Sequence, residues 1–203
     1  MIATGLERVP SRAGVDESSM LATEHRLGRS LPQMLRDFYR TVGQLPEVMG
    51  SHHKFVPVES LEISNGGLVF CRDRQDEMFW ALLEADLGEA DPPIVQGQPE
   101  LAEWHAHCKS SSVFLANFCC WQLVNAMPSM GSSPLGDGTI RALRKHMRVV
   151  GASFGFDMLS LVGADAGVLA SILLSIDRLY VGARSDAGLE HFQERFGIDL
   201  DWL

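Results

Sequence analysis

The chain has 203 residues, of which 46% are hydrophobic and 21% are charged, as is ordinary for a soluble globular protein. Its formal net charge of −9 disfavours nucleic acid as a direct ligand, because neutralising phosphates requires clustered Lys and Arg. The four cysteines are too few and too irregularly spaced for a disulfide scaffold. We therefore expect buried, reduced thiols in a cytoplasmic protein.

The sequence predicts neither a targeting segment nor a membrane span. Residues 1–19 carry five charged side chains and lack the continuous apolar core of a signal peptide. The stretch 158–176 is nearly all apolar, but Asp165 lies near its centre between two glycines. A charged residue there is costly in a bilayer, and the glycines indicate a turn. We read this stretch as two buried strands flanking a turn.

The N-terminal part predicts a loose arm over residues 1–15 and then two helices. The first is capped by Asp16 or Ser18 and ends near residue 27. The second is opened by Pro32 and ends at Gly43, which we expect to close it in the left-handed conformation. Its apolar side chains fall on one face at helical spacing, namely Leu31, Leu35, Phe38 and Val42.

The middle of the chain predicts short strands followed by a long helix. A loop at 45–54 and a short helix at 56–63 precede strands at 68–72 and 78–83, which flank a polar hairpin at 73–76. A further strand is expected at 94–96, and Ser110 or Ser111 caps a helix that runs to about residue 127. We expect these elements to share one core, which contains Leu35, Phe38, Phe70, Trp80 and Trp121.

Residues 128–138 are rich in Pro, Ser and Gly and predict a flexible connection. A basic amphipathic helix at 137–148, the two strands within 158–176, a strand at 179–183 and a helix at 185–196 follow. The whole pattern predicts one α+β domain over residues 16–203, in which N-terminal helices pack on a mostly antiparallel central sheet, with a C-terminal strand–helix extension.

Patterns typical of catalysis or metal binding are weak. His105 and His107 would share one face of a strand, but no second cluster supplies a third and fourth ligand. The adjacent His52 and His53 make a poor chelate. The sequence contains no Gly-x-Ser-x-Gly elbow, no phosphate-binding loop and no cysteine with a recognisable partner pattern. We therefore expect no catalytic residues, no metal and no cofactor.

Acidic residues are concentrated between Cys71 and Glu103, where the sequence contains nine carboxylates and only two arginines. Such a run is either a solvated surface or a partner surface, and the residues alone favour neither. As a partner surface it would suit a basic protein. Its candidate binding residues are Asp73, Gln75, Asp76, Glu77, Glu84, Asp86, Glu89 and Asp91. The basic helix at 137–148 is the alternative surface.

Several short motifs follow one another in a characteristic order between residues 20 and 125. They are Glu24, Leu27-Gly28, Leu31-Pro32, Leu35-Arg36, Phe38-Tyr39 and Gly43, then Leu61, Asn65-Gly66-Gly67-Leu68-Val69-Phe70-Cys71, Gln75, Trp80, Asp91-Pro92-Pro93-Ile94-Val95, Trp104, Ser112, Phe114-Leu115 and Trp121. In this order they resemble the SUKH superfamily, which includes yeast cell-wall assembly regulators and many bacterial toxin-immunity proteins. The segment from Leu179 onward fits its closing strand and helix more loosely, and residues 126–178 do not align.

The resemblance implies a non-enzymatic protein-binding module. The first expectation is an immunity protein that neutralises a polymorphic toxin such as a nuclease, and the acidic segment would complement a basic toxin domain. The alternative is an intracellular regulatory adaptor of the cell-wall or signalling type. A small enzyme fits the residues less well.

Overall fold

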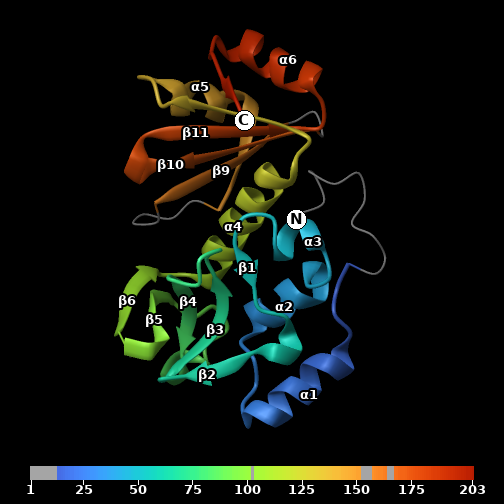
Figure 1. Ribbon diagram of the computed structural model, residues 1–203, viewed down its shortest axis with the longest axis vertical. Helices are drawn as coiled ribbons and strands as arrows, with labels where there is room; N and C mark the ends of the chain where they lie inside the picture. Colours follow the sequence, from blue (N-terminus) through green and yellow to red (C-terminus); the bar gives the residue numbers. More distant parts are fainter. Residues whose placement is uncertain (1–12, 102, 152–156, 164–166) are drawn as a thin grey trace. The chain divides into compact units, whose positions relative to one another are not determined.

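The computed structural model describes residues 13–101, 103–151, 157–163 and 167–203 (Figure 1). It is a mixed α+β structure with antiparallel sheets, as the sequence predicts. The chain forms two compact units, residues 13–115 and residues 116–203, whereas we expected one domain. The physical reason is that each unit builds a sheet of its own. None of the helices in the described ranges is long and apolar enough to cross a membrane.

Both predicted N-terminal helices are confirmed. Helix α1 (Glu17–Leu27) is capped by Asp16, whose carboxylate accepts a hydrogen bond from the Ser19 N–H (2.8 Å). Gly28 ends α1 in the left-handed conformation with φ 66°. Helix α2 (Gln33–Val42) follows Pro32. The chain before α1 is held rather than loose where it is described, because Val15 N donates to Tyr39 O (2.9 Å).

Gly43 ends α2 for a different reason from the one predicted. Its φ is −64°, so it does not need the left-handed region. A Cβ at this position would lie 2.6 Å from the Tyr39 carbonyl oxygen and 2.8 Å from Val15 Cγ2. Gly43 is therefore required by close packing against the segment that precedes α1.

The first unit continues with one short helix and a six-stranded sheet. Its further elements are α3 (Pro46–Met49), β1 (Lys54–Phe55), η1 (Val58–Ser60), β2 (Glu62–Ser64), β3 (Gly67–Arg72), β4 (Phe79–Leu83), η2 (Glu84–Asp86), β5 (Ile94–Gln98), η3 (Pro99–Leu101) and β6 (Glu103–Cys108). The strand order is β1-β3-β4-β5-β6, with β2 also paired to β3. The predicted strands at 68–72, 78–83 and 94–96 are confirmed.

The predicted helix at 56–63 is wrong. A single 3₁₀ turn, η1, is followed by an extended Leu61 and by β2, which pairs with β3 through the turn at residues 65–66. Side chains of α1 donate hydrogen bonds to carbonyl groups that a longer helix would have used in its own backbone bonds. Thr23 Oγ1 donates to Val58 O (3.1 Å), and Arg26 donates to Leu61 O (2.7 Å). Tertiary contacts thus override the local propensity.

Aromatic side chains connect α2 to the first sheet. Phe38 packs on Phe55 with ring centroids 4.7 Å apart, and Phe55, Phe70 and Phe114 continue the series. Leu35, Phe38, Phe70 and Trp80 are all buried, as predicted for one core. Trp121 is also buried, but it belongs to the second unit, where its ring lies edge-on to Tyr180 at 5.0 Å.

The opposite face of the first sheet is closed by Trp104. This half-buried side chain packs against the small cluster of Val69, Ala81 and Val95. Its Nε1 donates to Asn65 O (3.1 Å) in the β2–β3 turn. A Cβ on Gly67 would lie 2.7 Å from the Trp104 ring, so the glycine leaves the space that the indole occupies. The sheet is therefore curled enough for β6 to reach this turn.

The second unit begins within α4 (Ser111–Ala126) and contains the remaining elements. They are β7 (Ser129–Pro134), α5 (Thr139–His146), β8 (Met147–Val150), β9 (Met158–Gly163), β10 (Val168–Leu173), η4 (Leu174–Ile176), β11 (Arg178–Ala183), α6 (Asp186–Phe196) and β12 (Asp201–Trp202). The strand order is β12-β7-β11-β10-β9-β8, with every pair antiparallel. The predicted long helix, basic helix, strand pair, late strand and last helix are confirmed; Asp165 lies outside the described residues.

The predicted flexible connection at 128–138 is wrong in its first half. Residues 129–134 form β7, which pairs with β11 on one side and β12 on the other. Its small residues are a packing requirement: a Cβ on Gly131 would lie 2.9 Å from the Leu200 Cβ. Ser132 Oγ accepts hydrogen bonds from the Arg178 guanidinium. A Ser- and Gly-rich composition indicates a close approach here instead of flexibility.

The second sheet lies between two helical layers (Figure 1). On one face, Leu143 of α5 and Leu189 and Phe192 of α6 join the apolar residues of the strands in one core. On the other face, α4 approaches closely, since a Cβ on Gly182 would lie 2.7 Å from the Val124 carbonyl oxygen. Both faces of this sheet are therefore covered within residues 116–203.

Glu24 joins α1 to α2 and offers a first test of the fold. Its carboxylate accepts hydrogen bonds from Leu31 N (2.8 Å) and from the Arg36 guanidinium, and both side chains are mostly buried. Glu24→Ala leaves these donors with fewer acceptors, so we expect the free energy of unfolding to fall by about 2 kcal/mol. Glu84→Ala removes an exposed pair with Arg29 and is the control, with an expected loss below about 1 kcal/mol. Urea titration followed by circular dichroism measures both, and equal losses would contradict this role of Glu24.

Candidate functional site

The predicted acidic binding residues do not form one cluster, because β4 separates them. Asp73, Gln75, Asp76 and Glu77 lie in the turn that precedes β4, whereas Glu84 follows its last residue. The five residues of β4 span about 17 Å at roughly 3.3 Å per residue. The predicted site therefore divides into two groups at opposite ends of this strand.

The group that follows β4 is largely occupied with structural roles. Glu84 forms an ion pair with Arg29 (2.8 Å). Asp91 accepts hydrogen bonds from Ser112 N (2.7 Å) and from the hydroxyls of Ser110 and Ser112, and it thereby caps α4. Burial alone would raise the pKa of Asp91, but these hydrogen bonds outweigh burial and lower it. Of this group, Glu89 is exposed and Asp86 is half-buried.

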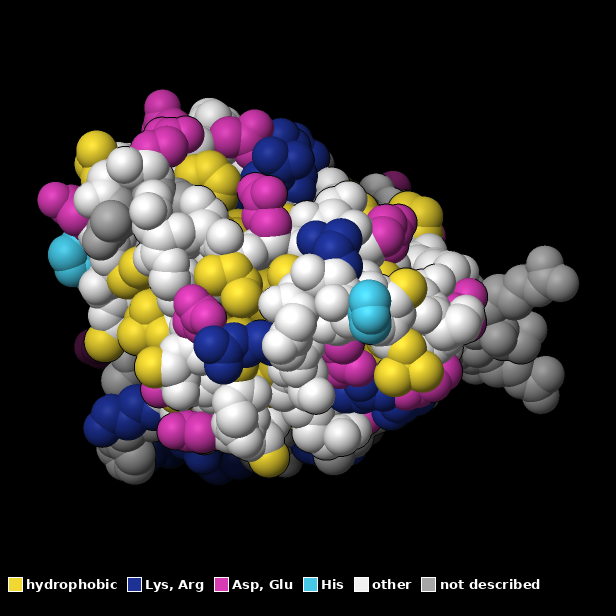
Figure 2. Space-filling view, turned by 90° about the horizontal axis from the view of Figure 1, so that it is seen from below, with side chains coloured by type: hydrophobic (Ala, Val, Ile, Leu, Met, Phe, Trp, Pro, Cys, Tyr) yellow, Lys and Arg dark blue, Asp and Glu magenta, His cyan; other side chains and the backbone are white. Residues whose placement is uncertain are grey.

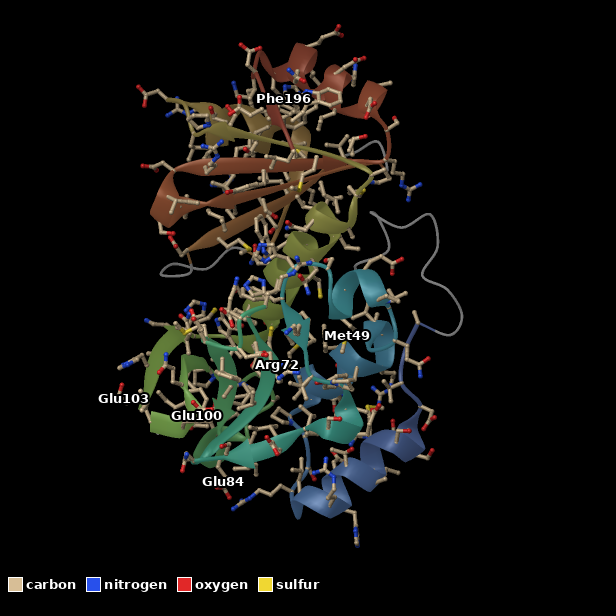
Figure 3. All side chains as sticks on the ribbon, in the orientation of Figure 1. Met49, Arg72, Glu84, Glu100, Glu103 and Phe196 are labelled. Atoms are coloured by element: carbon tan, nitrogen blue, oxygen red, sulfur yellow. The ribbon has the colours of Figure 1, made fainter. Side chains whose placement is uncertain are left out.

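The group that precedes β4 meets a second turn at the same end of the sheet. Gln98 Nε2 donates to Glu77 O (3.2 Å), so the β3–β4 turn touches the β5–β6 turn. We call residues 73–78 and 98–103, apart from residue 102, the turn surface. It includes Glu100 of η3 and Glu103, the first residue of β6 (Figure 3). Neither residue was predicted as a site residue, because only the pairing of β5 with β4 and β6 places their turn at the same end of the sheet as Glu77.

Two of the carboxylates in the turn surface shape it. Asp73 Oδ1 accepts hydrogen bonds from Glu77 N (2.8 Å) and Met78 N (3.2 Å), which closes the turn. Asp76 has φ 59° and pairs with Lys54 (3.5 Å) and Arg72 (3.3 Å). The remaining carboxylates, Glu77, Glu100 and Glu103, are exposed. Within the described ranges these three make no ion pair, so their charge faces solvent.

A pocket of about 290 Å³ opens at the edge of the turn surface. It is lined by Met78, Gln96, Gly97, Gln98, Glu103 and His105. Its polar groups are one carboxylate, two side-chain amides and one imidazole, and Gly97 contributes backbone alone. This set offers hydrogen-bond acceptors and one negative charge, which suits a cationic side chain such as arginine.

His105 and His107 lie on the Trp80 face of the first sheet. His105 faces Gln96, which in turn pairs with Trp80, and the His107 ring is 6.2 Å from the Trp80 ring. The two therefore share a face, as predicted. The described part of the chain contains no group of three or more His, Cys, Asp or Glu side chains that is arranged to hold a metal ion.

The His52–His53 pair is neutral at physiological pH. Their Nδ1 atoms are 3.0 Å apart, and the His53 ring lies edge-on to Trp80 at 5.0 Å. Burial lowers the pKa of His53 to about 4, and the neighbouring His52 acts in the same direction. Burial also lowers the pKa of His52. These rings therefore pack as uncharged side chains next to Trp80.

The four cysteines are buried, and they form no disulfide with one another. Burial raises the pKa of Cys120 to about 12 and that of Cys119 further still. Burial also raises the pKa of Cys108, whose thiol donates to Ser110 O (3.3 Å). Since the thiolate is the reactive form, these three thiols are poor nucleophiles at neutral pH.

Negative charge is distributed unequally between the two units. Residues 13–115 contain sixteen acidic and eight basic side chains, a formal net charge of −8, whereas residues 116–203 have a net charge of −2. Figure 2 shows acidic side chains spread among hydrophobic and basic ones on the face viewed, with no continuous acidic block. The first unit is therefore acidic as a whole, with its carboxylates dispersed over this face.

Comparisons with protein-family models, with curated proteins and with solved structures find no match for this chain, so the geometry described above is what bears on its function.

Proposed function

We propose that the protein is a non-enzymatic protein-binding module that captures a basic protein through the turn surface, and that its role is to neutralise a toxin domain. The observation that carries the proposal is the meeting of two hairpin turns at one end of the sheet. These turns carry the exposed Glu77, Glu100 and Glu103, and Glu103 also lines a polar pocket. The SUKH resemblance of residues 20–125 agrees with this role.

The charge of the first unit supports a basic partner. A net charge of −8 on residues 13–115 attracts a cationic protein over long range and raises the association rate. The pocket next to Glu103 adds a short-range element, because a carboxylate and two amides complement one guanidinium. Long-range attraction and a receptor for a single side chain together favour a protein partner over a small molecule.

The role is tested by co-expression. If the gene next to this one encodes a protein with a C-terminal toxin domain, that domain should arrest growth when expressed alone. Co-expression of the present protein should restore growth, and the two proteins should co-purify. Continued arrest together with the absence of a complex would contradict the immunity role.

The surface is tested by charge reversal. We expect Glu100→Lys combined with Glu103→Lys to slow association with the toxin domain about tenfold at low salt, because the replaced charges lie in the contact. Asp86→Lys combined with Glu89→Lys makes the same charge change at the other end of β4. This control should alter the rate by less than about twofold at physiological salt, where screening acts over about 8 Å.

Stopped-flow kinetics at two salt concentrations measure both variants. Equal slowing by the two pairs would show that only the net charge matters. Slowing by the control pair alone would place the interface around the loop that follows β4. Either result would overturn the assignment of the turn surface.

A further inference from the structure

The second unit contains a groove along one side of α5, and the proposed function makes no use of it. The groove has a volume of about 690 Å³ and lies along α5. Its lining residues are Leu135, Gly136, Asp137, Gly138, Ile140, Arg141, Arg144, Lys145 and Asp177. This volume is within the range of ligand-binding sites, roughly 300–1,000 Å³.

One wall of the groove is cationic. Arg141, Arg144 and Lys145 are spaced at i, i+3 and i+4 on α5, so they form one face of the helix. All three side chains are exposed, and they form no ion pair within the described ranges. Three adjacent positive charges without acidic partners stand out in a unit whose net charge is −2.

The floor of the groove is apolar and its backbone is fixed. Leu135 and Ile140 are half-buried and pack against the core of the second unit. Leu135 N donates to Asp177 O (2.7 Å), which ties the end of β7 to the turn before β11. Ala142 N donates to Gly138 O (2.9 Å) at the start of α5. The groove is thus formed before any ligand arrives.

We propose that this groove binds a short acidic peptide segment of a partner protein, with carboxylates on the α5 cations and an aliphatic side chain on Leu135 and Ile140. Exposed cations hold a small free anion weakly, because water and salt screen the attraction. A peptide gains from several carboxylates at once and from the apolar floor. A nucleic acid is bound mainly by neutralising many phosphates, and the groove offers only three cations together with an apolar floor that a phosphate backbone cannot use.

The site is independent of the turn surface. It has the opposite charge, it consists of other residues and it belongs to the other unit. An acidic segment that binds here would contact none of the residues 73–103. Peptide binding to the groove can therefore be tested separately from the proposed function.

Fluorescence anisotropy with a labelled peptide Glu-Glu-Leu-Glu-Glu-Leu tests the inference on the full chain. We expect binding that weakens as salt is raised and that is lost with the analogue in which Gln replaces every Glu. Arg144→Gln should raise the Kd about threefold, and Arg141→Gln combined with Arg144→Gln about tenfold. Arg195→Gln removes an exposed arginine of α6 outside the groove and should leave the Kd unchanged.

Three results would overturn the proposal. The first is equal binding of the Gln analogue, which would show that the carboxylates are not recognised. The second is equal weakening by Arg195→Gln, which would reduce the effect to net charge. The third is tighter binding of labelled oligo(dT) that is also lost in the double variant, which would make the groove a nucleic-acid site. Circular dichroism confirms that each variant is folded.

Discussion

Asn117→Leu is expected to lower the free energy of unfolding of residues 116–203 by about 3 kcal/mol. Asn117 is fully buried in α4 and makes two bonds to the chain that forms the second sheet. Its Oδ1 accepts from Ser160 N (2.9 Å), and its Nδ2 donates to Gly151 O (2.8 Å). Leucine matches the volume but leaves both backbone groups without this partner, and an unpaired buried group is costly.

Asn125→Leu is the matched control for this prediction. Asn125 is on the same helix, but its side chain is half-buried and donates to the Trp121 carbonyl one turn earlier (2.8 Å). Its replacement should lower the free energy of unfolding by less than about 1 kcal/mol. The carbonyl of a helical residue already accepts a backbone hydrogen bond, so Trp121 O loses only a second donor. Amide hydrogen exchange of Ser160 gives a local measurement. Exchange of this amide at the wild-type rate in Asn117→Leu would refute the anchoring role of Asn117.

Gly97→Ala should be similarly destabilising for residues 13–115, by about 3 kcal/mol. A Cβ on Gly97 would collide with the Glu103 carbonyl oxygen and would lie 3.2 Å from Trp104 Cε3. The colliding atom belongs to the backbone of the neighbouring strand, so it cannot move without breaking the pairing of β5 with β6. The turn surface depends on that pairing, and we therefore also expect weaker capture of a basic partner.

Gly88→Ala is the control, because a Cβ there would meet no atom within 4 Å and its φ is not in the left-handed region. This change should leave the melting temperature unchanged or slightly raised. Thermal unfolding monitored by circular dichroism and by tryptophan fluorescence compares the two variants. Equal melting temperatures would show that the strands yield readily at Gly97.

The elements that were predicted well are those with local signals. Asp16 and Ser185 cap their helices through their own side chains, and the polar residues after β3 mark a hairpin. Strand β7 was not predicted, because Ser and Gly ordinarily indicate a turn. In this strand a small residue is needed because Leu200 packs closely against Gly131. That contact depends on a residue nearly seventy positions away, which local reasoning does not include.

The candidate site shows the same division between local and long-range information. The acidic residues after Cys71 are evident in the sequence, but their grouping depends on which strands pair. Lys54 and Arg29, distant in the chain, neutralise Asp76 and Glu84, whereas a hydrogen bond from Gln98 brings the turn that carries Glu100 to the turn that carries Glu77. Charge counted along the sequence therefore located the acidic segment, whereas the division of that segment into two groups at the ends of β4 depends on the strand pairing.

The pairing of β12 with β7 has a consequence for self-association. A strand at the margin of a sheet presents unpaired N–H and C=O groups to other chains, and proteins protect such margins with charges, prolines or bulges. β7 has one proline at its end, Pro134, but its residues 129–133 are only Ser, Met and Gly. Three residues cover it: Asp201 and Trp202 pair with Ser132 and Gly131, and Leu203 N donates to Met130 O (2.9 Å). This short cover keeps an aggregation-prone margin out of reach of neighbouring molecules.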